Sequence, residues 1–350
     1  MERNINATDI VQKIIEEAIV QKASDIHFLP QIDTLRVRLR IDGLLYDLQI
    51  IPKRFQFEII ARLKVLASLR SDEHFKAQDG RFPFVFEGEN IDIRISIIPT
   101  YCGENAVLRL LSKKQTETTL EELGFSLLDI EKISEALKYR SGLILLTGPT
   151  GSGKTSTLYT LLQLLRNDTS SLITIEDPIE YAVPGITQVQ VNESFGMHFA
   201  SALRGILRQD PDVIMVGEIR DAETAKVAVN AALTGHLIFS TLHTGDAVGV
   251  VPRLRDMGIE PYLIAGTVKL VIAQRLVRKV QGGYFAGRTV VAETMQMTEK
   301  LGALIIKNSS LAAIRKQTIS DGMQEMILHG KQKVESGITT FEEVLRVLHE

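Results

Sequence analysis

Apolar and polar residues along this chain follow two kinds of pattern, and the change between them divides it into two parts. The first part opens with apolar residues at helical spacing over residues 10–19, where Asp9 and Gln12 are placed as a helix cap and its return partner. Segments that alternate apolar and polar residues follow, with turn signals at residues 42–43 and 88–90. Strands are expected at residues 25–28, 35–41, 44–51, 81–87, 91–98 and 105–111, and a second helix at residues 55–69.

The second part carries short, wholly apolar runs, which are typical of buried parallel strands. Each run is followed by a cluster of glycine, acidic residues or histidine; the runs lie at residues 143–147, 172–175, 213–216 and 237–241. Chemistry in open α/β sheets lies at the carboxyl ends of the strands, so these clusters are expected to meet at one edge.

The two patterns predict an α/β protein with two domains. Residues 1–111 are expected to form a smaller, mainly antiparallel α+β domain, and residues 123–350 a parallel α/β domain that ends in a helical part. Residues 112–122 are polar and lose the periodicity, which indicates an interdomain linker.

One segment has the composition of a phosphate-binding loop. Residues 148–155 read G-P-T-G-S-G-K-T, between an apolar strand and an apolar helix. The glycines let consecutive backbone N–H groups surround phosphate oxygens, and the positive end of the helix faces the same anion. Lys154 is expected to reach the β- and γ-phosphates and Thr155 to hold Mg²⁺. Contacts to the nucleotide are expected from Gly148, Pro149, Thr150, Gly151, Ser152, Gly153, Lys154, Thr155 and Ser156.

Two acidic clusters follow predicted strands and offer the carboxylates that phosphoryl transfer to water requires. Glu218 follows the apolar run of residues 213–216 and is the predicted base that positions the water; a structural ion pair with Arg220 is the alternative. Glu180, Glu176 and Asp177 are candidates for the metal side. Glu176 and Asp177 would otherwise brace the turn at Pro178.

His236 and His243 bracket the apolar run of residues 237–241. They are predicted to sense the γ-phosphate or to couple its loss to movement, while ordinary core or surface histidines are the alternative. Metal ligation is disfavoured, because the local sequence offers no third nitrogen or sulfur ligand.

Arginines can neutralise the charge that develops on the transferred phosphoryl group. Arg204 and Arg208 are spaced to lie on one helix face, and Arg220 follows Glu218. Arg81 and Arg94 lie in alternating strands of the first part. For any one arginine a solvated surface role is the alternative.

The composition bears on the kinds of partner and the cellular location that can be expected. The chain has 350 residues, 45% hydrophobic and 24% charged, with a formal net charge of −3, which does not indicate a nucleic-acid or membrane surface. Cys102 is the only cysteine, which excludes an intrachain disulfide and fits a reducing compartment. Residues 1–10 lack a signal-peptide pattern, and no apolar run approaches the length of a membrane span, so a cytoplasmic location is expected.

Taken in order, the motifs resemble the type II/type IV secretion ATPase (GspE/PilB-like) superfamily. They are A-S-D-I-H, R-x-R-x-D-G, the phosphate loop, E-D-P-I-E, L-R-Q-D-P-D-x-I-M-V-G-E-I-R-D, T-G-H-L-I-F-S-T-L-H-T and A-Q-R-L-V-R, and they span nearly the whole chain. The resemblance implies a PAS-like N-terminal domain on a RecA-like P-loop ATPase domain, in a cytoplasmic homo-hexamer that uses ATP and Mg²⁺. It labels residues 148–155 as Walker A, Glu180 as the acidic-box glutamate, Glu218 as the Walker B glutamate, and His236 and His243 as the histidine box. It also implies arginines from both domains at the nucleotide.

Two departures from the larger assembly ATPases refine the expectation. The chain is expected to lack the additional N-terminal domain, and no tetracysteine element follows A-Q-R-L-V-R-K, so zinc is not expected. The tail at residues 321–348 resembles assembly ATPases, whereas the A-I-R-N-L-I-R-E motif of retraction motors has only a short echo at residues 313–315.

The resemblance is therefore to the compact competence ATPase of Gram-positive bacteria, which powers a pseudopilus for DNA uptake. Its expected partner is an inner-membrane platform protein, which would hold it at the inner face of the cell membrane without direct DNA binding. A type IV pilus or type II secretion motor for assembly or retraction, a DNA-pumping hexamer, and a nucleotide-gated interaction protein with little turnover are the alternatives.

Overall fold

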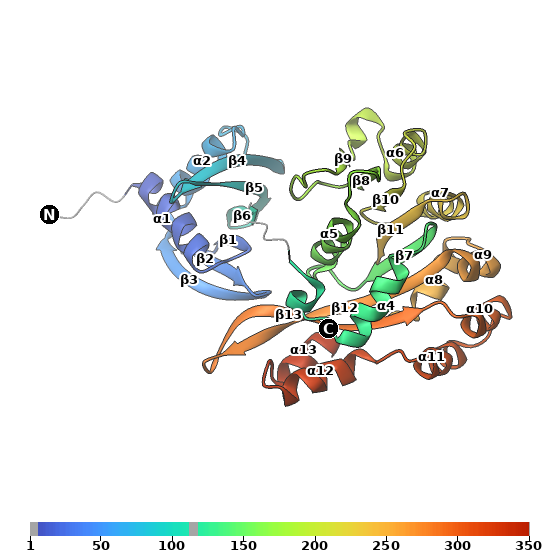
Figure 1. The fold of residues 1–350 in the computed structure, drawn as a ribbon. Helices are drawn as coiled ribbons and strands as arrows, with labels where there is room; N and C mark the ends of the chain where they lie inside the picture. Colours follow the sequence, from blue (N-terminus) through green and yellow to red (C-terminus); the bar gives the residue numbers. More distant parts are fainter. Residues whose placement is uncertain (1–5, 112–117, 350) are drawn as a thin grey trace. The chain divides into compact units, whose positions relative to one another are not determined.

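The computed structural model describes residues 6–111 and 118–349, which fall into two compact units divided between Thr116 and Glu117 (Figure 1). Each unit has its own sheet and its own hydrophobic core. Within these described residues, no helix combines the length and the apolar character needed to cross a membrane.

The first unit is an antiparallel sheet packed against two helices. Its six strands lie in the order β3-β2-β1-β6-β5-β4, with every neighbouring pair antiparallel. Alternate strand residues, such as Ile26, Phe28, Ile93 and Ile95, face the helices and form one buried cluster with them. The elements are α1 (Ala7–Val20), β1 (Asp25–Pro30), β2 (Thr34–Ile41), β3 (Leu44–Pro52), the 3₁₀ turn η1 (Lys53–Phe55), α2 (Gln56–Leu66), β4 (Gln78–Phe86), β5 (Glu89–Thr100) and β6 (Gly103–Leu111).

The predicted cap of the first helix is wrong. Asn6, not Asp9, caps α1, because the Asn6 side chain accepts a hydrogen bond from the Asp9 N–H at 2.8 Å. Gln12 donates to Glu16 one turn further on instead of returning to the cap. Asp9 lies inside the first helical turn, where its negative charge interacts favourably with the positive end of the helix dipole without capping the helix.

The second unit is a three-layer α/β/α arrangement around a seven-stranded sheet of order β13-β12-β7-β11-β10-β8-β9. All neighbouring strands are parallel except the β12–β13 hairpin. The elements before this hairpin are α3 (Leu120–Leu123), α4 (Leu127–Ala136), β7 (Gly142–Thr147), α5 (Lys154–Leu165), β8 (Leu172–Glu176), β9 (Thr187–Gln190), the 3₁₀ turn η2 (Glu193–Phe195), α6 (Phe199–Ile206), β10 (Val213–Val216), α7 (Ala222–Leu233), β11 (Leu237–Leu242), α8 (Val250–Asp256) and α9 (Pro261–Thr267). The rest are β12 (Val268–Gln281), β13 (Tyr284–Gln296), α10 (Glu299–Ile306), α11 (Leu311–Ser320), α12 (Met326–Glu335) and α13 (Phe341–His349).

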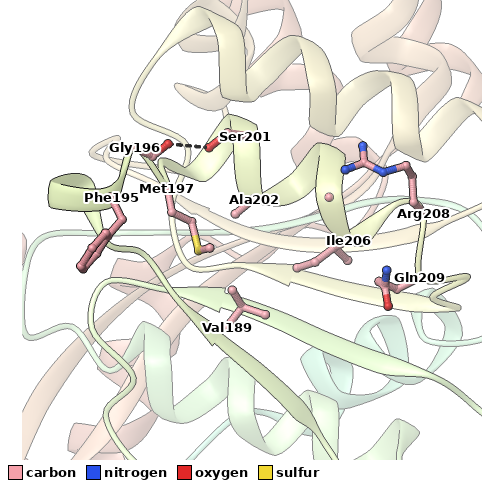
Figure 2. Close-up of a pocket in the computed structure, with 10 residues that line it drawn as sticks. Val189, Phe195, Gly196, Met197, Ser201, Ala202, Ile206, Arg208 and Gln209 are labelled. Carbon is pink, nitrogen blue, oxygen red and sulfur yellow. Dashed lines mark hydrogen bonds between the residues drawn. The ribbon is translucent and has the colours of Figure 1, made fainter.

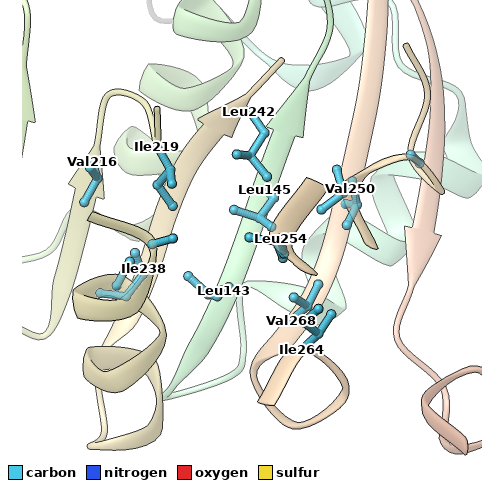
Figure 3. Packing of buried hydrophobic residues seen from close by; sticks show 14 of the residues in the cluster. Leu143, Leu145, Val216, Ile219, Ile238, Leu242, Val250, Leu254, Ile264 and Val268 are labelled. Atoms are coloured by element: carbon cyan, nitrogen blue, oxygen red, sulfur yellow. The ribbon is translucent and has the colours of Figure 1, made fainter. Parts of the chain in front are cut away.

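Successive residues of the central strands face opposite layers, which makes the apolar runs continuous. Leu143 and Leu145 of β7 pack into a cluster with helices α6 to α13 (Figure 3), whereas Ile144 and Leu146 pack against α3, α4 and α5. The parallel register brings the carboxyl ends of β7, β11, β10 and β8 to one edge, as predicted.

The predicted linker, residues 112–122, overlaps the second unit. Residues 112–117 lie outside the described residues, whereas Thr119 caps α3 and Leu120 is buried in the second unit. Thr119 and Glu122 form a capping box at the start of this helix.

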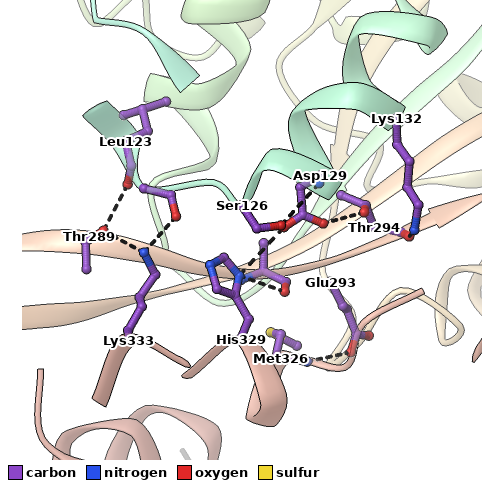
Figure 4. A network of polar contacts seen from close by, with 12 residues as sticks. Leu123, Ser126, Asp129, Lys132, Thr289, Glu293, Thr294, Met326, His329 and Lys333 are labelled. Carbon is purple, nitrogen blue, oxygen red and sulfur yellow. Dashed lines mark hydrogen bonds and ion pairs between the residues drawn. The ribbon is translucent and has the colours of Figure 1, made fainter. Parts of the chain in front are cut away.

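A buried polar network attaches the C-terminal helices to the sheet (Figure 4). Asp129 of α4 accepts hydrogen bonds from Ser126 and from Thr294 of β13, both at 2.6 Å. Burial lowers the pKa of His329, and its Nδ1 accepts a hydrogen bond from the Ala292 N–H at 3.2 Å. Burial also lowers the pKa of Lys333 to about 8, although Asp129 opposes this shift. The network holds α4, β13 and α12 together.

Candidate functional site

The phosphate loop, residues 148–155, joins the buried end of β7 to the start of α5. Gly148 has φ of 144°, and a Cβ there would lie 2.5 Å from the Gln274 carbonyl oxygen, so only glycine fits. Gly153, with φ of 87°, is the N-cap of α5 and leaves the helix N-terminus open toward the loop. The local backbone therefore has the conformation that phosphate binding requires.

Lys154 is half-buried beside the loop. Its Nζ donates hydrogen bonds to the carbonyl oxygens of Gly148 at 2.8 Å and Pro149 at 2.9 Å. Burial lowers the pKa of Lys154 to about 8, the nearby Glu218 carboxylate opposes this shift, and Arg275 adds to it. Lys154 and Glu218 therefore interact electrostatically across the carboxyl edge of the sheet.

Glu218 follows β10 and lies between two cationic or potentially cationic side chains. Arg220 Nη2 is 2.5 Å from Glu218 Oε1, and His243 Nε2 is 3.5 Å from Oε2. The hydrogen bond to Glu218 raises the pKa of Arg220, and the charge of Asp177 raises it further. The ion pair that the sequence offered as the alternative is thus present, and it leaves Glu218 partly exposed, at 15% of its side chain.

Thr147 connects the phosphate loop to the segment that carries His243. Its buried hydroxyl accepts from the Thr244 N–H at 2.8 Å and contacts the Thr244 hydroxyl at 2.7 Å. No role was predicted for Thr147 from the sequence, although its position directly before Gly148 was the available signal. Arg275 and Gln274 were also missed. They belong to the A-Q-R-L-V-R motif, which served to identify the family resemblance but had no function assigned to its residues. Gln274 Nε2 donates to the Ser152 carbonyl oxygen at 2.8 Å from below the loop.

The carboxylates predicted for the metal side lie in different surroundings. Glu176 is buried and accepts hydrogen bonds from Tyr159, from Thr174 at 2.6 Å and from Gln188 at 3.0 Å. Burial and the hydrogen bond to Glu176 raise the pKa of Tyr159. Both oxygens of Glu176 therefore already accept hydrogen bonds inside the unit, as expected of a carboxylate that braces the fold.

Asp177 and Glu180 lie beyond the end of β8 and are exposed and half-buried, respectively. In the part of the chain that the structure describes, no three His, Cys, Asp or Glu side chains gather as they would around a metal ion. The exposed Thr155 hydroxyl at the start of α5 fits Mg²⁺, which keeps most of its water and binds through few protein oxygens together with substrate phosphates.

The structure separates the two histidines. His243 follows the carboxyl end of β11, next to Glu218, whereas His236 precedes the same strand, next to Gly142 at the opposite edge. A strand of six residues, about 20 Å long, lies between them. The His236 Nδ1 contacts the Ala231 carbonyl oxygen at 3.0 Å. The predicted pair therefore does not converge on the phosphate loop of its own chain.

Arg204 and Arg208 make their contacts away from the phosphate loop, unlike Arg220, which pairs with Glu218. Arg204 pairs with Glu223 at 2.8 Å, and Arg208 donates to the Arg204 carbonyl oxygen at 2.9 Å. Arg208 also lines a pocket of ≈ 460 Å³ between β9 and α6, shown in Figure 2 with Phe195, Met197 and Ile206. This pocket contains no residue of the phosphate loop.

In the first unit, Arg81 of β4 lies directly opposite Arg94 of β5, and Arg94 lies opposite Arg109 of β6. Arg109 in turn donates to the buried Asp25 at 3.0 Å. Three arginines from adjacent strands thus form one row across the sheet.

The family model and the similar proteins of known name indicate the same family. Residues 2–346 match the family described as "Type II/IV secretion system protein". The chain is 42% identical to the type II secretion system protein HxcR of Pseudomonas aeruginosa over 97% of its own length and 76% of that protein. It is 40% identical to the type IV pilus assembly ATPase PilB of Myxococcus xanthus over 96% of its length and 67% of that protein.

Solved structures show the same fold. The pilus retraction motor PilT with bound ADP is 31% identical, with a TM-score of 0.70 over 96% of each chain. The ATPase DotB of Legionella pneumophila superposes with a TM-score of 0.80 over 100% of this chain and 98% of that one. At 23% identity the DotB likeness shows the fold alone, which is RecA-like with an additional α+β unit.

Proposed function

This chain belongs to the type II/IV secretion system protein family, and from this premise we propose that it is an ATP hydrolase that drives assembly of a type IV pilus-like competence pseudopilus for DNA uptake. The observation that carries the enzymatic part is the placement of Lys154 and Glu218 at one edge of the sheet, where the charge of Glu218 opposes the lowering of the Lys154 pKa by burial. A phosphate-binding lysine and a carboxylate for the attacking water are the two groups that the reaction requires.

The proposed reaction assigns one task to each group. The N–H groups of the phosphate loop and Lys154 bind the triphosphate, and Thr155 with Asp177 and Glu180 holds Mg²⁺, directly or through water. The ion neutralises charge on the phosphate oxygens. Glu218 orients the water that attacks the γ-phosphorus and accepts its proton, while the bond from the γ-phosphorus to the β–γ bridging oxygen breaks. His243 and Arg220, which hold Glu218, are placed to respond to loss of the γ-phosphate.

The proposed working form is a cytoplasmic homo-hexamer that contacts an inner-membrane platform protein. The names of the relatives support a machine of this class, since they include a pilus assembly ATPase and a type II secretion protein. Arg81 and Arg94 would meet the nucleotide of a neighbouring subunit, and Arg204 and Arg208 would add charge from the second unit. ATP would close the two units of neighbouring subunits around the nucleotide, and hydrolysis would release them.

The competence assignment rests on the compact β12–β13 hairpin and on the tail. The hairpin turns directly through Gly282 and Gly283, without an inserted cysteine element, and residues 321–348 include α12 and α13. The retraction motor PilT is also similar, so a motor for another filament is the second candidate.

The test is natural transformation in the source bacterium carrying Glu218→Gln at the native locus, scored beside pilus display and protein secretion. Glu335→Gln, at an exposed glutamate that ends α12, is the matched control. Loss of DNA uptake at normal protein level, with secretion and the control unaffected, is expected. Loss of pili or of secretion instead assigns the motor to another machine, and full function of Glu218→Gln contradicts the role of hydrolysis.

A further inference from the structure

The segment between β11 and α8, residues 243–249, is held on two sides; we call it the β11–α8 loop. On the side of the phosphate loop, the Thr147 hydroxyl accepts from the Thr244 N–H at 2.8 Å. Arg275 Nη2 donates to the Gly245 carbonyl oxygen at 2.9 Å, and its Nη1 would lie 3.2 Å from a Cβ on Gly148. The position of His243 is therefore tied to the position of the phosphate loop.

The other side is held by the buried carboxylate of Glu293 in β13. Its Oε1 accepts from the Ala247 N–H of the β11–α8 loop at 2.8 Å, and its Oε2 accepts from the Met326 N–H at the start of α12 at 3.4 Å. Only 2% of Glu293 is exposed. One carboxylate thus bridges the backbone of the β11–α8 loop and the backbone of a C-terminal helix.

Arg315 of α11 makes a second bridge to the same loop. Its Nη2 pairs with Oδ2 of Asp246, while Oδ1 of Asp246 accepts from the Gly249 N–H at 2.7 Å. Its Nη1 lies 3.7 Å from Oε1 of Glu325, the residue that precedes α12. Arg315 belongs to the A-I-R echo at residues 313–315, for which the proposed reaction has no use.

The Arg315–Asp246 ion pair is expected to affect the geometry of the loop more than the stability of the unit. The side chains of Arg315 and Asp246 are 35% and 36% exposed, and an exposed ion pair adds little to folding stability. The pair nevertheless fixes the geometry of a loop whose backbone is also held by Glu293. Loss of the pair should therefore loosen the loop without unfolding the unit.

We propose that Arg315 and Glu293 are positioning residues of the nucleotide site: acting through Asp246 and Ala247, they hold His243 against Glu218. Helices α11 and α12 thereby influence turnover from outside the site. The inference rests on the proposed ATP hydrolysis, and it adds a route by which a load on the C-terminal helices changes the rate of that reaction.

The first experiment is a double-mutant cycle in the full-length protein with Asp246→Asn, Arg315→Gln and both together, measured as kcat and KM for ATP. Each single variant is expected to lower kcat about tenfold while KM stays within about twofold, because nucleotide binding is unchanged and alignment is lost. The double variant is expected to match the single variants, because both remove the same bridge.

The matched control is Arg346→Gln. Arg346 is a C-terminal arginine of similar side-chain exposure, 29%, which pairs with Glu343 of its own helix α13. It should keep the wild-type kcat. An equal fall of kcat in Arg346→Gln, or single-variant effects that multiply in the double variant, would overturn the positioning role. Hydrolysis by Glu218→Gln at the wild-type rate would instead contradict the proposed function.

A second measurement does not depend on turnover. Amide hydrogen exchange of residues 243–249 is expected to be faster by at least about twofold in Arg315→Gln and Glu293→Gln than in the wild type. Arg346→Gln should leave this exchange unchanged. Unchanged exchange in Arg315→Gln, or equal acceleration in Arg346→Gln, refutes the bridge even if the isolated protein hydrolyses ATP slowly.

Discussion

Glu218 lies among basic side chains, and their contacts with its carboxylate set its orientation in the site. Arg220 and His243 hold its two oxygens, and its negative charge keeps part of the charge on the half-buried Lys154. A carboxylate held in this way keeps one orientation, which is what a water-positioning base requires. The proposed chemistry therefore depends on two side chains, Lys154 and Glu218.

Glu218→Gln should lower kcat for ATP hydrolysis by about 10²–10⁴-fold, because the amide keeps the shape but cannot accept the proton of the attacking water. The affinity for ATP should stay close to that of the wild type. Steady-state hydrolysis and binding of a fluorescent nucleotide check both values. A variant that hydrolyses ATP at more than a tenth of the wild-type rate would exclude Glu218 as the base.

Nucleotide affinity should fall as the pH rises above 8. Burial lowers the pKa of Lys154 to about 8, so the side chain is protonated below this pH and loses its charge above it. Bound phosphate favours the charged form, and affinity should therefore fall by up to about tenfold per pH unit above 8. Titration of ATP binding from pH 7 to 9.5 tests the slope, and Lys154→Ala, which binds more weakly, should show no slope in this range.

Two side chains each hold one helix in place, Asn6 at the start of α1 and Glu343 in α13. In the first unit, the Asn6 side chain satisfies one of the free N–H groups at the start of α1. In the second unit, α13 is attached to β12 by Glu343, which is 2% exposed and contacts Arg278 at 2.8 Å and Arg346 at 2.6 Å. Both attachments predict measurable effects.

Asn6→Ala should lower the free energy of unfolding of the first unit by about 1 kcal/mol, because it removes the cap of α1. Asp9→Ala should cost no more than about 0.5 kcal/mol, since Asp9 contributes only its charge in the first turn. Urea denaturation of the full-length protein, followed in the first unit, compares the two. A larger loss for Asp9→Ala than for Asn6→Ala would contradict the capping by Asn6.

Glu343→Gln should destabilise the second unit by about 3 kcal/mol at pH 7, because it leaves the partly buried charges of Arg278 and Arg346 without the buried carboxylate that holds them. Burial by itself would raise the pKa of Glu343, but hydrogen bonds from Arg346 and Arg278 outweigh it and lower the pKa to about 2. The carboxylate therefore stabilises the fold above the unfolded pKa of 4.5, and this contribution is lost as the pH falls toward 2. Unfolding measured at several pH values should show the wild type and the variant converging over this range.

The whole molecule consists of two units with separate cores, and each core closes on residues of its own unit. This separation is what a motor needs if its two units are to move as rigid bodies. The proposed hexamer adds a second requirement, because the arginine row of β4, β5 and β6 can serve a neighbouring nucleotide only in an assembly.

Glu218→Gln with ATP and Mg²⁺ should form a stable hexamer, because nucleotide remains bound at every subunit interface without turnover. Native mass spectrometry or analytical ultracentrifugation checks the mass. The variant Arg81→Ala with Arg94→Ala should weaken this assembly or its hydrolysis while leaving nucleotide binding by the single subunit intact. A monomer under all of these conditions contradicts the ring.

Sequence alone was sufficient for the features that depend on neighbouring residues. The glycines and Lys154 of the phosphate loop, the apolar runs of β7, β8, β10 and β11, and the turn at Asp42-Gly43 all follow from local spacing, because backbone conformation there is set within a few residues. The long β12–β13 hairpin was missed because much of it is buried on both faces and shows no alternation.

The tertiary structure decided which side chains meet. His236 and His243 are equivalent by sequence, but the direction of β11 places them at opposite edges of the sheet. Glu176 and Glu218 both end apolar strands, yet Tyr159 and Gln188 enclose the first while the second stays partly exposed beside Lys154. The β11–α8 loop is contacted by Arg275, Glu293 and Arg315, which lie far from it along the chain. A sequence determines periodicity and loop chemistry locally, whereas these contacts depend on strand order and packing, which only the folded chain specifies.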